Sequence, residues 1–419
     1  CYGDNRDLHY PLRRQRQMVI RDRGIMEPFV LFMILERNGI VRRFFKFFFI
    51  VLILAGLGTA GCQAFTAYQA DQRAKAQLNA RPKLKKAKDG TSISPSMHNL
   101  KAYHLALKQQ YPFLYKTAYQ VPMTSSVGRD VIVPGLRRTI SYDFEKQKRN
   151  ATDEMTPQGM TIADRYLLLT AYDHAHQHAS VIYVLDKKTG RYLRTIQVPG
   201  RPHLGGIAYD PVARNVWITG SDSDGSALLS FSMKALNEAV AKKSTQPITY
   251  NHAISLPTIE RASTVTYYDD QLFVGFFNMY DHGKLAGYPI ARSGPFKGSI
   301  ASYRIKAVTG DVEWSDGNGS STMDRQIQGV AFYQDLIILS QSYGSKSSRL
   351  YIFPFSALHD LDEKNAQTVI ETPPYLEQLY ANDGQLLMLF ESGSKAYARP
   401  TITVMDRLLS VNINALLGQ

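Results

Sequence analysis

The chain has 419 residues, of which 44% are hydrophobic and 11% aromatic, and it carries a formal net charge of +13 at pH 7. This is ample apolar material for one large domain or two small ones, and such an aromatic content is natural where strands pack face to face. The two cysteines, Cys1 and Cys62, both lie at the N-terminal end. The later part of the chain therefore has no internal disulfide and no cysteine-based metal or nucleophilic site.

The positive charge is unevenly distributed along the chain. Residues 1–100 contain 17 Lys and Arg against 7 Asp and Glu, which leaves 32 against 29 for the remainder. The basic excess therefore belongs to the N-terminal arm. The remainder lacks the overall charge of a nucleic-acid-binding domain, so we expect no nucleic acid among its partners.

An apolar run near the N-terminal end predicts a membrane segment. Residues 44–61 follow the pair Arg42 and Arg43 and are almost free of polar residues after Lys46. A basic flank before an apolar core is typical of an export signal or a single membrane-spanning helix. We expect a signal-anchor or transmembrane segment at residues 37–67. The residues before Cys62 distantly resemble a lipoprotein box, but Thr59 stands where Leu is usual, which favours an uncleaved anchor.

The flanks of this run bear on topology. Residues 1–36 are expected to be a cytoplasmic segment or untranslated upstream sequence, because Cys1 is no initiator and Met26 or Met33 would be a sensible start. Lys and Arg lie on both sides of the apolar run, so charge alone does not orient it. We expect the C-terminal part to be membrane-anchored, extracytoplasmic and at the cell surface, because the short leader resembles an export signal.

Two segments link the apolar run to the main domain. Residues 68–96 are rich in Ala, Lys, Arg, Gln and Ser and predict a basic stem, which either contacts anionic lipid or wall polymer or is a solvated spacer. Residues 97–130 are expected to contain a short amphipathic helix and a linker. Apolar residues recur there at helical spacing, namely Leu100, Tyr103, Leu107, Tyr111 and Leu114. The apolar stripe is expected to pack on the following domain, with a partner-binding helix as the alternative.

One pattern recurs five times in the rest of the chain. Each copy is a small polar start, a short apolar strand, a tight turn built on Asp, Asn or Pro, and a second apolar strand. The copies are QGMTIADRYLLLT (158–170), GGIAYDPVARNVWIT (205–219), STVTYYDDQLFVG (263–275), QGVAFYQDLIILS (328–340) and EQLYANDGQLLMLF (377–390). Their shorter spacings match propeller blades, and the longer ones require loop insertions.

Further strand-like segments follow most copies. Alternating apolar residues with Gly and Asp turns predict antiparallel sheet. We therefore predict an all-β fold at residues 131–419: a five-bladed, alternatively six-bladed, β-propeller of four-stranded antiparallel blades. Residues 138–144 are a candidate outer strand that would close the ring with the last blade. Residues 401–405 and 408–413 are the candidate third and fourth strands of that blade.

A family resemblance supports this architecture. The segments PQGM, YLLLTAY, SVIYVLDKKTGRYLRTI, PHLGGIAYDP and NVWITG look like exported bacterial β-propellers of the broad NHL, YncE-like and SMP-30/gluconolactonase-like kind. The resemblance covers residues 157–413 and concerns structural motifs, so it implies a fold more than a reaction. The acidic metal-ligand pattern of gluconolactonases is not visible at matching strand positions, which weakens a transfer of lactonase activity.

In a propeller, the blade-to-blade loops and the loops between second and third strands share one face around the channel. We expect the functional site on this face. The first set of loops supplies His203, Glu260, Arg261, Arg325, Tyr375 and Glu377, and the second supplies Tyr172, Asp173, His174, His176, His178, Tyr343, Glu391 and Lys395. Gln158 and Gln328 occupy equivalent first positions in their copies and are expected to bond near the channel, and Gly159, Gly206 and Gly329 to allow close packing at the axis.

The functional candidates from these loops fall into three groups. His174, His176 and His178 alternate along one loop and could ligate a divalent metal, zinc or calcium, although a solvated polar loop is the simpler interpretation. Glu260, Glu377 and Glu391 are candidate acid–base carboxylates. The candidate ligand-binding residues are Gln158, Tyr172, His203, Arg261, Arg325 and Gln328; the arginines could clamp an anionic ligand or merely pair with the carboxylates.

The sequence leaves three functions open. The first is an anchored, extracytoplasmic propeller that binds a ligand, a surface protein or a wall polymer through this face without turnover. The second is a metal-assisted hydrolase or lactonase at the channel mouth. The third is a glycan-binding or glycan-active propeller, because the channel mouth combines tyrosines with carboxylates.

Overall fold

The computed structural model describes residues 39–222, 225–256, 259–279, 283–300, 312–313, 326–358, 361 and 363–418. The chain divides into two units, Cys1–Gln77 and Leu78–Gln419. The predicted segment 1–36 lies outside the described residues. Helix α2 (Gly39–Asn79) contains the apolar run, and its side chains are exposed along residues 44–54. In the described part of the chain, no helix is long and apolar enough to cross a membrane.

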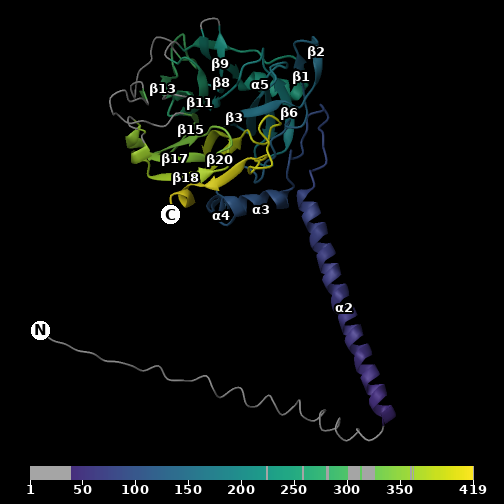
Figure 1. Cartoon of the computed structure of the whole chain (residues 1–419). Helices are drawn as coiled ribbons and strands as arrows, with labels where there is room; N and C mark the ends of the chain where they lie inside the picture. The colour runs from purple at the N-terminus through teal and green to yellow at the C-terminus, as the bar shows by residue number, and fades with distance from the viewer. Residues whose placement is uncertain are drawn as a thin grey trace, which may run out of the picture. The chain divides into compact units, whose positions relative to one another are not determined.

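The second unit contains, beside a two-stranded hairpin, five larger antiparallel sheets formed by strands consecutive in the chain. The first blade is β3 (Met155–Ala163), β4 (Tyr166–Asp173), β5 (Val181–Asp186) and β6 (Tyr192–Gln197); the second is β7 (Ile207–Asp210), β8 (Asn215–Asp222), β9 (Gly225–Ser232) and β10 (His252–Ser255); the third is β11 (Ala262–Tyr268), β12 (Gln271–Phe276), β13 (Lys284–Pro289) and β14 (Val312–Glu313); the fourth is β15 (Ile327–Tyr333), β16 (Leu336–Gln341), β17 (Ser348–Pro354) and β18 (Thr368–Thr372); the fifth is β19 (Leu376–Asn382), β20 (Gln385–Phe390) and β21 (Leu409–Asn412). Figure 1 labels strands of all five blades.

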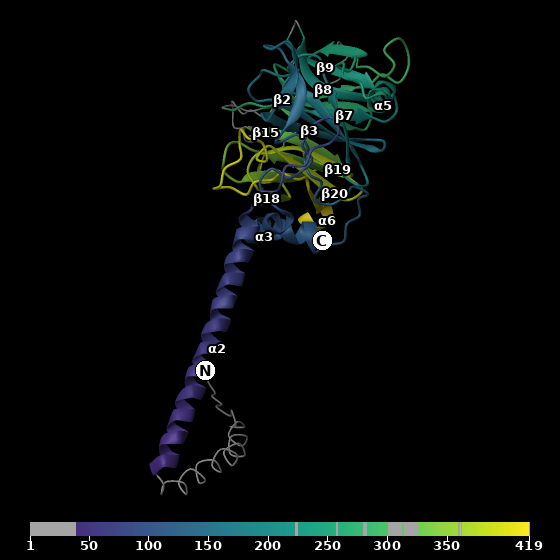
Figure 2. The same cartoon turned by 90° about the vertical axis from the view of Figure 1, so that its right-hand side faces the viewer.

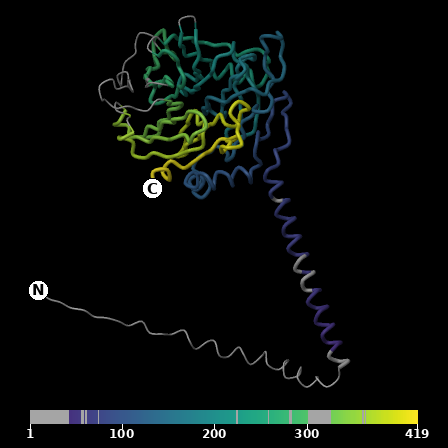
Figure 3. The backbone as a smooth tube through the Cα atoms, viewed as in Figure 1, coloured from purple at the N-terminus to yellow at the C-terminus, as the bar shows by residue number. Residues whose placement is uncertain are grey.

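These sheets form a closed ring. The first strands β3, β7, β11, β15 and β19 contact one another in this order, and β19 returns to β3. In Figure 2 the labels of β3, β7, β15 and β19 lie towards the middle of the unit. Figure 3 follows the backbone from the teal second blade through the green blades to the yellow last strand. The chain is therefore a five-bladed β-propeller, as predicted, and a sixth blade is absent from this ring.

The alternation of side chains along each strand explains how the blades pack. Leu167 and Leu169 on β4 face the last blade, whereas Leu168 between them faces the second blade. Five buried apolar clusters fill the five blade interfaces in this way. Because neighbouring side chains on a strand point to opposite faces, each blade is apolar on both sides. The near-continuous apolar runs in the five repeats follow from this requirement.

The five sequence repeats are the innermost hairpins of the five blades, as predicted. Each hairpin pairs the first two strands of a blade through a tight turn. Asp164, Asp269 and Asp383 occupy these turns with positive φ angles, a conformation that Asp and Asn tolerate better than most residues. The turn residues in the repeats are thus explained by backbone geometry.

The last blade is completed differently from the prediction. Its third strand is β21, which pairs with β20, and residues 401–405 form no strand. Residues 138–144 do not join this blade either, because β1 (Thr139–Asp143) pairs with β2 (Lys148–Thr152) in a separate hairpin. The N-terminal segment instead meets the last blade where Ile132 bridges Arg407, with Leu408 N donating to Val131 O at 2.9 Å.

The predicted amphipathic helix is two helices, α3 (Leu100–Gln110) and α4 (Pro112–Tyr119). Asn99 caps α3 by accepting a hydrogen bond from Ala102 N. The helix ends before Pro112 because proline lacks an N–H and restricts the residue before it. Tyr103, Leu107 and Leu114 are buried in the cluster between the fourth and fifth blades. The stripe packs on the propeller, as expected.

Two other helices follow strands, α5 (Met233–Lys242) after β9 and α6 (Ile413–Leu416) after β21, and two short 3-10 helices, Phe355–Ala357 and Glu363–Asn365, lie in the fourth blade. The C-terminal half of the segment expected to be a stem is also ordered. Thr91, Ser92, Ser94 and Ser96 are buried, and Ser92 N donates to Arg138 O at 2.8 Å. These residues are therefore part of the propeller unit.

The axis of the ring is filled by Gln378 of β19. Its Oε1 accepts from Met160 N at 3.0 Å and Ile207 N at 3.1 Å, and its Nε2 donates to Ile207 O at 2.9 Å and Val265 O at 3.0 Å. This amide joins blade five to blades one, two and three and uses its full capacity of two donors and two acceptors.

Glycines allow close packing at the axis, as expected. A Cβ on Gly206 would collide with the backbone of Thr264 and Val265, and one on Gly329 would lie 2.8 Å from Glu377 O. A Cβ on Gly159 would lie 2.9 Å from Gln378 Oε1. The first strands of neighbouring blades therefore approach too closely for side chains at these positions.

We predict that Gln378→Met destabilises the propeller strongly. The variant keeps the volume but leaves two N–H groups and two carbonyls at the axis without partners, each costing about 1–3 kcal/mol, so we expect a loss of ~3 kcal/mol or more. Urea unfolding followed by circular dichroism measures it, with the exposed Gln246→Ala as control. Equal stability of the two variants would show that the axial amide is dispensable.

Candidate functional site

The first residue of each repeat is turned toward the channel by a break in strand pairing. The register shifts between Pro157 and Met160 in β3, and equivalent shifts occur in β11, β15 and β19. A β-bulge inserts a residue and re-aims its side chain. The residues at these shifts are Gln158, Ser263, Gln328 and Glu377. In the second blade the position is Gly205, whose Cβ would collide with Ser263 O.

These four side chains line one cavity of about 530 Å³. The remaining wall comes from loops on the face that the sequence predicts to be functional. The lining residues are Gln158, His203, Arg261, Ala262, Ser263, Phe277, Met279, Gln328, Ser342, Tyr343, Gly344, Tyr375, Glu377, Glu391 and Tyr397. The first, third, fourth and fifth blades contribute strand residues, and the loops on either side of the second blade add His203 and Arg261, so closure of the ring assembles the cavity.

Glu377 and Glu391 form a buried carboxyl pair in this cavity. Their exposed fractions are 3% and 8%, their side chains are hydrogen-bonded to each other, and Gln158 Nε2 donates to Glu391 Oε1. Burial raises the pKa of Glu391 to about 8. Burial and the nearby Glu391 charge raise the pKa of Glu377 well above its usual value. The pair therefore retains at least one proton at neutral pH, as expected for two carboxyl groups in one desolvated site.

Aromatic rings form one side of the cavity. Tyr172 stacks on His203 with ring centroids 4.2 Å apart, and Tyr375 lies against Tyr397 at 4.8 Å. Tyr397 also meets His174 edge-on at 5.4 Å. Partial desolvation, followed by the positive charge of Arg261, lowers the pKa of His203, so its imidazole is neutral at neutral pH. Burial is also the main cause that raises the pKa of Tyr397 to about 12.

The predicted binding residues come together in most cases. Gln158, His203, Arg261 and Gln328 line the cavity, and Tyr172 lies behind His203. Arg261 is exposed and donates through Nη2 to Phe277 O at 3.4 Å, and Gln328 Nε2 donates to Ser342 O at 3.4 Å.

Two further predicted residues are not placed in the cavity. Of the three candidate carboxylates, Glu377 and Glu391 meet, whereas Glu260 is exposed and is not among the described residues that line the cavity. Arg325 lies outside the described residues. The acid–base candidates thus reduce to the one carboxyl pair.

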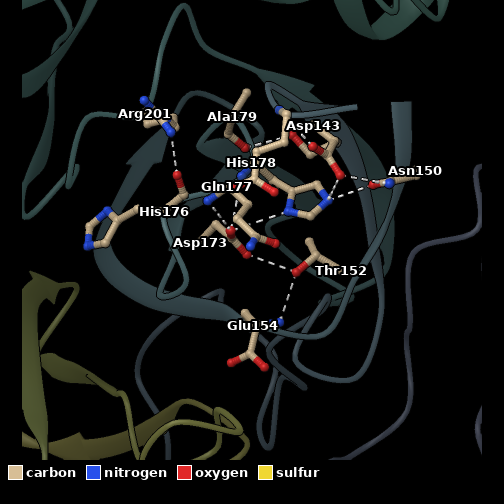
Figure 4. A network of polar contacts seen from close by, with 12 residues as sticks. Asp143, Asn150, Thr152, Glu154, Asp173, His176, Gln177, His178, Ala179 and Arg201 are labelled. Atoms are coloured by element: carbon tan, nitrogen blue, oxygen red, sulfur yellow. Dashed lines mark hydrogen bonds and ion pairs between the residues drawn. The ribbon is translucent and has the colours of Figure 1, made fainter. Parts of the chain in front are cut away.

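His178 lies in a buried network (Figure 4) and is not among the described residues that line the cavity. Its Nδ1 lies 3.2 Å from Asp173 Oδ2 and its Nε2 lies 2.6 Å from Asn150 Oδ1. Asp173 also accepts from Thr152 Oγ1 at 2.8 Å, and Asn150 donates to Asp143. The network ties the β1–β2 hairpin to the loop after β4. It gives His178 a structural role.

The structure thus does not bring the three predicted histidines together, and a metal at this loop stays a prediction. His178 uses both ring nitrogens within the network, while His174 and His176 are exposed. His174 Nδ1 lies 3.1 Å from Tyr172 Oη. Over the described ranges, no three His, Cys, Asp or Glu side chains are grouped so that they could hold a metal ion. The three histidines occupy every second position, which would place their rings on one side of an extended loop. The loop is not extended, because it turns at His176, where φ is +54°.

Sequence analysis missed Gln378, Ser263 and Tyr397. The signal for Gln378 was present, because the second positions of the five repeats are Gly159, Gly206, Thr264, Gly329 and Gln378. One long polar side chain among glycines indicates a group that fills the space the glycines leave. Tyr397 lies in an irregular loop whose path no periodicity predicts.

The sheet order and the closed ring thus define a five-bladed propeller with a cavity at one mouth of its channel. No family model matches the sequence, and no curated protein matches it. Similar solved structures include PQQ-bound aldose sugar dehydrogenase from Streptomyces coelicolor, with 14% identity over 70% of this chain and 99% of that chain and a TM-score of 0.37. The Dos1 propeller has 13% identity over 62% and 60%, with a TM-score of 0.31. Kuenenia stuttgartiensis hydrazine synthase has 10% identity over 57% and 56%, with a TM-score of 0.31.

The chain thus spans little more than half the length of the hydrazine synthase chain that it matches. At these scores the similarities carry no argument about ligand, reaction or partner. The predicted propeller kind is confirmed at the level of fold. Membership of the NHL, YncE-like or SMP-30 group stays a prediction.

We predict that Glu391→Gln changes how stability depends on pH. The native pKa of Glu391, about 8, exceeds the unfolded value of about 4.3, so the native state keeps a proton that the unfolded chain releases between these values. Wild-type stability should fall as pH rises through this window, by at most about 1.4 kcal/mol per pH unit for one proton. The variant should lose the part of this dependence that Glu391 contributes, so its stability should fall less steeply, with Glu377 as the remaining titrating group of the pair.

Urea unfolding at about pH 5, 6, 7 and 8 tests this dependence. The exposed Glu238→Gln is the matched control, because Lys242 lowers the pKa of Glu238 and removes its titration from the window. A constant difference between wild type and Glu391→Gln across the series would mean that the carboxyl pair is ionised in the folded protein.

Proposed function

We propose that this propeller is a binding module whose cavity takes a neutral, polyhydroxylated ligand of the sugar class. The observation that carries the proposal is the proton-retaining Glu377–Glu391 pair beside the Tyr375–Tyr397 rings. A volume of about 530 Å³ lies within the range of small-molecule sites. The ligand would bind at the loop-rich mouth of the channel.

The chemistry of the lining supports an uncharged hydroxylated ligand. A carboxyl pair that shares a proton both donates and accepts hydrogen bonds, as do the amides of Gln158 and Gln328. Ligand hydroxyl groups need both kinds of partner in a desolvated site. The neutral His203 ring and the tyrosine faces offer flat apolar surface, and Arg261 at the rim adds donors.

We predict that Tyr397→Ala weakens sugar binding by tenfold or more. Loss of the ring removes a face of the cavity and leaves Tyr375 without its stacking partner. Binding of neutral mono- and oligosaccharides is screened on a glycan array, and the dissociation constant of a hit is measured by calorimetry. Tyr333→Ala, at the opposite end of β15, is the control and should bind as wild type does.

Absence of binding across neutral sugars, with retained folding, would refute the proposed ligand class. Equal affinities of Tyr397→Ala and wild type would instead place the ligand elsewhere on the molecule. Saturable binding that Tyr397→Ala weakens tenfold or more, with a moderate loss of affinity in Glu391→Gln, would support the site as described.

A second candidate is acid–base catalysis by the same carboxyl pair. Paired carboxyl groups with raised pKa values in a cavity are frequent in catalytic sites. Glu391→Gln distinguishes the two functions, because it should abolish turnover of a bound sugar while it changes affinity only moderately. Product formation from a bound oligosaccharide by wild type, lost in this variant, would favour the enzyme.

We also propose that the propeller is attached to the outer face of a membrane. The exposed apolar side chains of residues 44–54 in α2 support attachment, since such a surface is otherwise left in water. We predict that protease added to intact cells digests the propeller. Digestion only after lysis would place it in the cytoplasm.

A further inference from the structure

A second cavity, of about 380 Å³, lies beside the loop that follows β20. Glu391 and Tyr397 of this loop line the first cavity, whereas Gly393, Ser394, Lys395 and Ala398 line the second. The opposite wall comes from the segment after α2 and from the segment before β1. Its remaining lining residues are Arg81, Leu84, Ser96, Met97, Leu136, Arg137 and Asp153.

Two guanidinium groups face this cavity without a carboxylate partner. Arg81 Nε donates to Ser96 O at 2.8 Å and Arg137 Nη1 donates to Pro82 O at 2.6 Å. Within the described ranges, neither side chain forms an ion pair. Partial burial, followed by the positive charge of Arg81, lowers the pKa of Arg137. The carbonyls of Ser96 and Pro82 thus hold the two positively charged guanidinium groups near each other. Both guanidinium groups have further N–H donors that these hydrogen bonds do not use.

The third cation of the cavity is already neutralised. Lys395 Nζ lies 3.0 Å from Asp153 Oδ1 and also contacts Glu154. These carboxylates therefore serve the lysine rather than the arginines. Counting Arg81, Arg137 and Lys395 against Asp153 and Glu154 leaves a net charge of +1, and the cations without a carboxylate contact are Arg81 and Arg137.

Ser394 provides an independent indication of a ligand. Its side chain is fully buried, it lines the cavity, and its Oγ has no hydrogen-bond partner among the described residues. Buried hydroxyl groups normally have a partner, because an unsatisfied one costs about 1–3 kcal/mol. A bound oxyanion would accept a hydrogen bond from the Ser394 hydroxyl and would also pair with the guanidinium groups of Arg81 and Arg137.

We propose that this second cavity binds a phosphate or sulfate group, free or attached to a larger molecule. The planar forks of Arg81 and Arg137 present N–H pairs suited to tetrahedral oxyanions, and the Ser394 hydroxyl adds a donor. The cavity is larger than one such group, which leaves room for an organic substituent. The site is independent of the sugar-binding cavity.

Calorimetric titration of the full chain with inorganic phosphate at low ionic strength tests the proposal. We expect saturable binding at one site, competed by sulfate. Arg137→Gln should weaken it tenfold or more, because charge-assisted hydrogen bonds are lost. Arg399→Gln, an exposed arginine of the same loop that donates only to Ala398 O among the described contacts, is the matched control and should bind as wild type does.

Ser394→Ala keeps the test falsifiable if Arg137→Gln fails to fold. This variant removes a hydroxyl that has no partner, so its melting temperature without phosphate should equal or exceed that of wild type, while its phosphate affinity should fall several-fold. A parallel titration with glycerol phosphate shows whether an organic substituent adds affinity. No saturable phosphate binding by wild type, or unchanged affinity in both Arg137→Gln and Ser394→Ala, would overturn the proposal.

Discussion

The structure depends on one primary amide at the axis of the ring. Gln378 reaches from the fifth blade to backbone groups of the first three blades, and its four hydrogen bonds satisfy polar groups that converge away from water. Leaving such groups unpaired is expensive, so the amide fixes how closely the first strands approach. Glycine at Gly159, Gly206 and Gly329 is the consequence for the sequence, because a Cβ there would meet a neighbouring strand or the amide itself.

The cavity is a second consequence of the same packing. Immediately before the axial positions, the strands of four blades shift register and aim one side chain each toward the channel mouth. These side chains line the cavity of about 530 Å³. Desolvation at this depth keeps a proton on Glu377 and Glu391. Packing at the hub therefore determines both the shape of the site and its protonation.

The amino-acid sequence predicted the repeating part of this architecture better than its irregular parts. Period-two apolar strands and Asp turns are local signals, and the five inner hairpins follow from them. Gln158, Arg261, Gln328, Glu377 and Glu391 could be grouped because rotational symmetry places equivalent positions together. The histidine loop could not be predicted in this way, because His178 contacts Asn150 of the separate β1–β2 hairpin as well as the nearby Asp173. Tyr397 and closure of the last blade at Ile132 likewise depend on segments without periodicity.

Hydrogen exchange at the hub measures whether Gln378 holds the first strands together. The amides of Met160 and Ile207 donate to Gln378 Oε1 at 3.0 and 3.1 Å, so they should open only with global unfolding. We expect both to be among the slowest-exchanging amides, together with those of the blade cores. Exchange of these two amides at the rate of surface loops would contradict a hub held by this side chain.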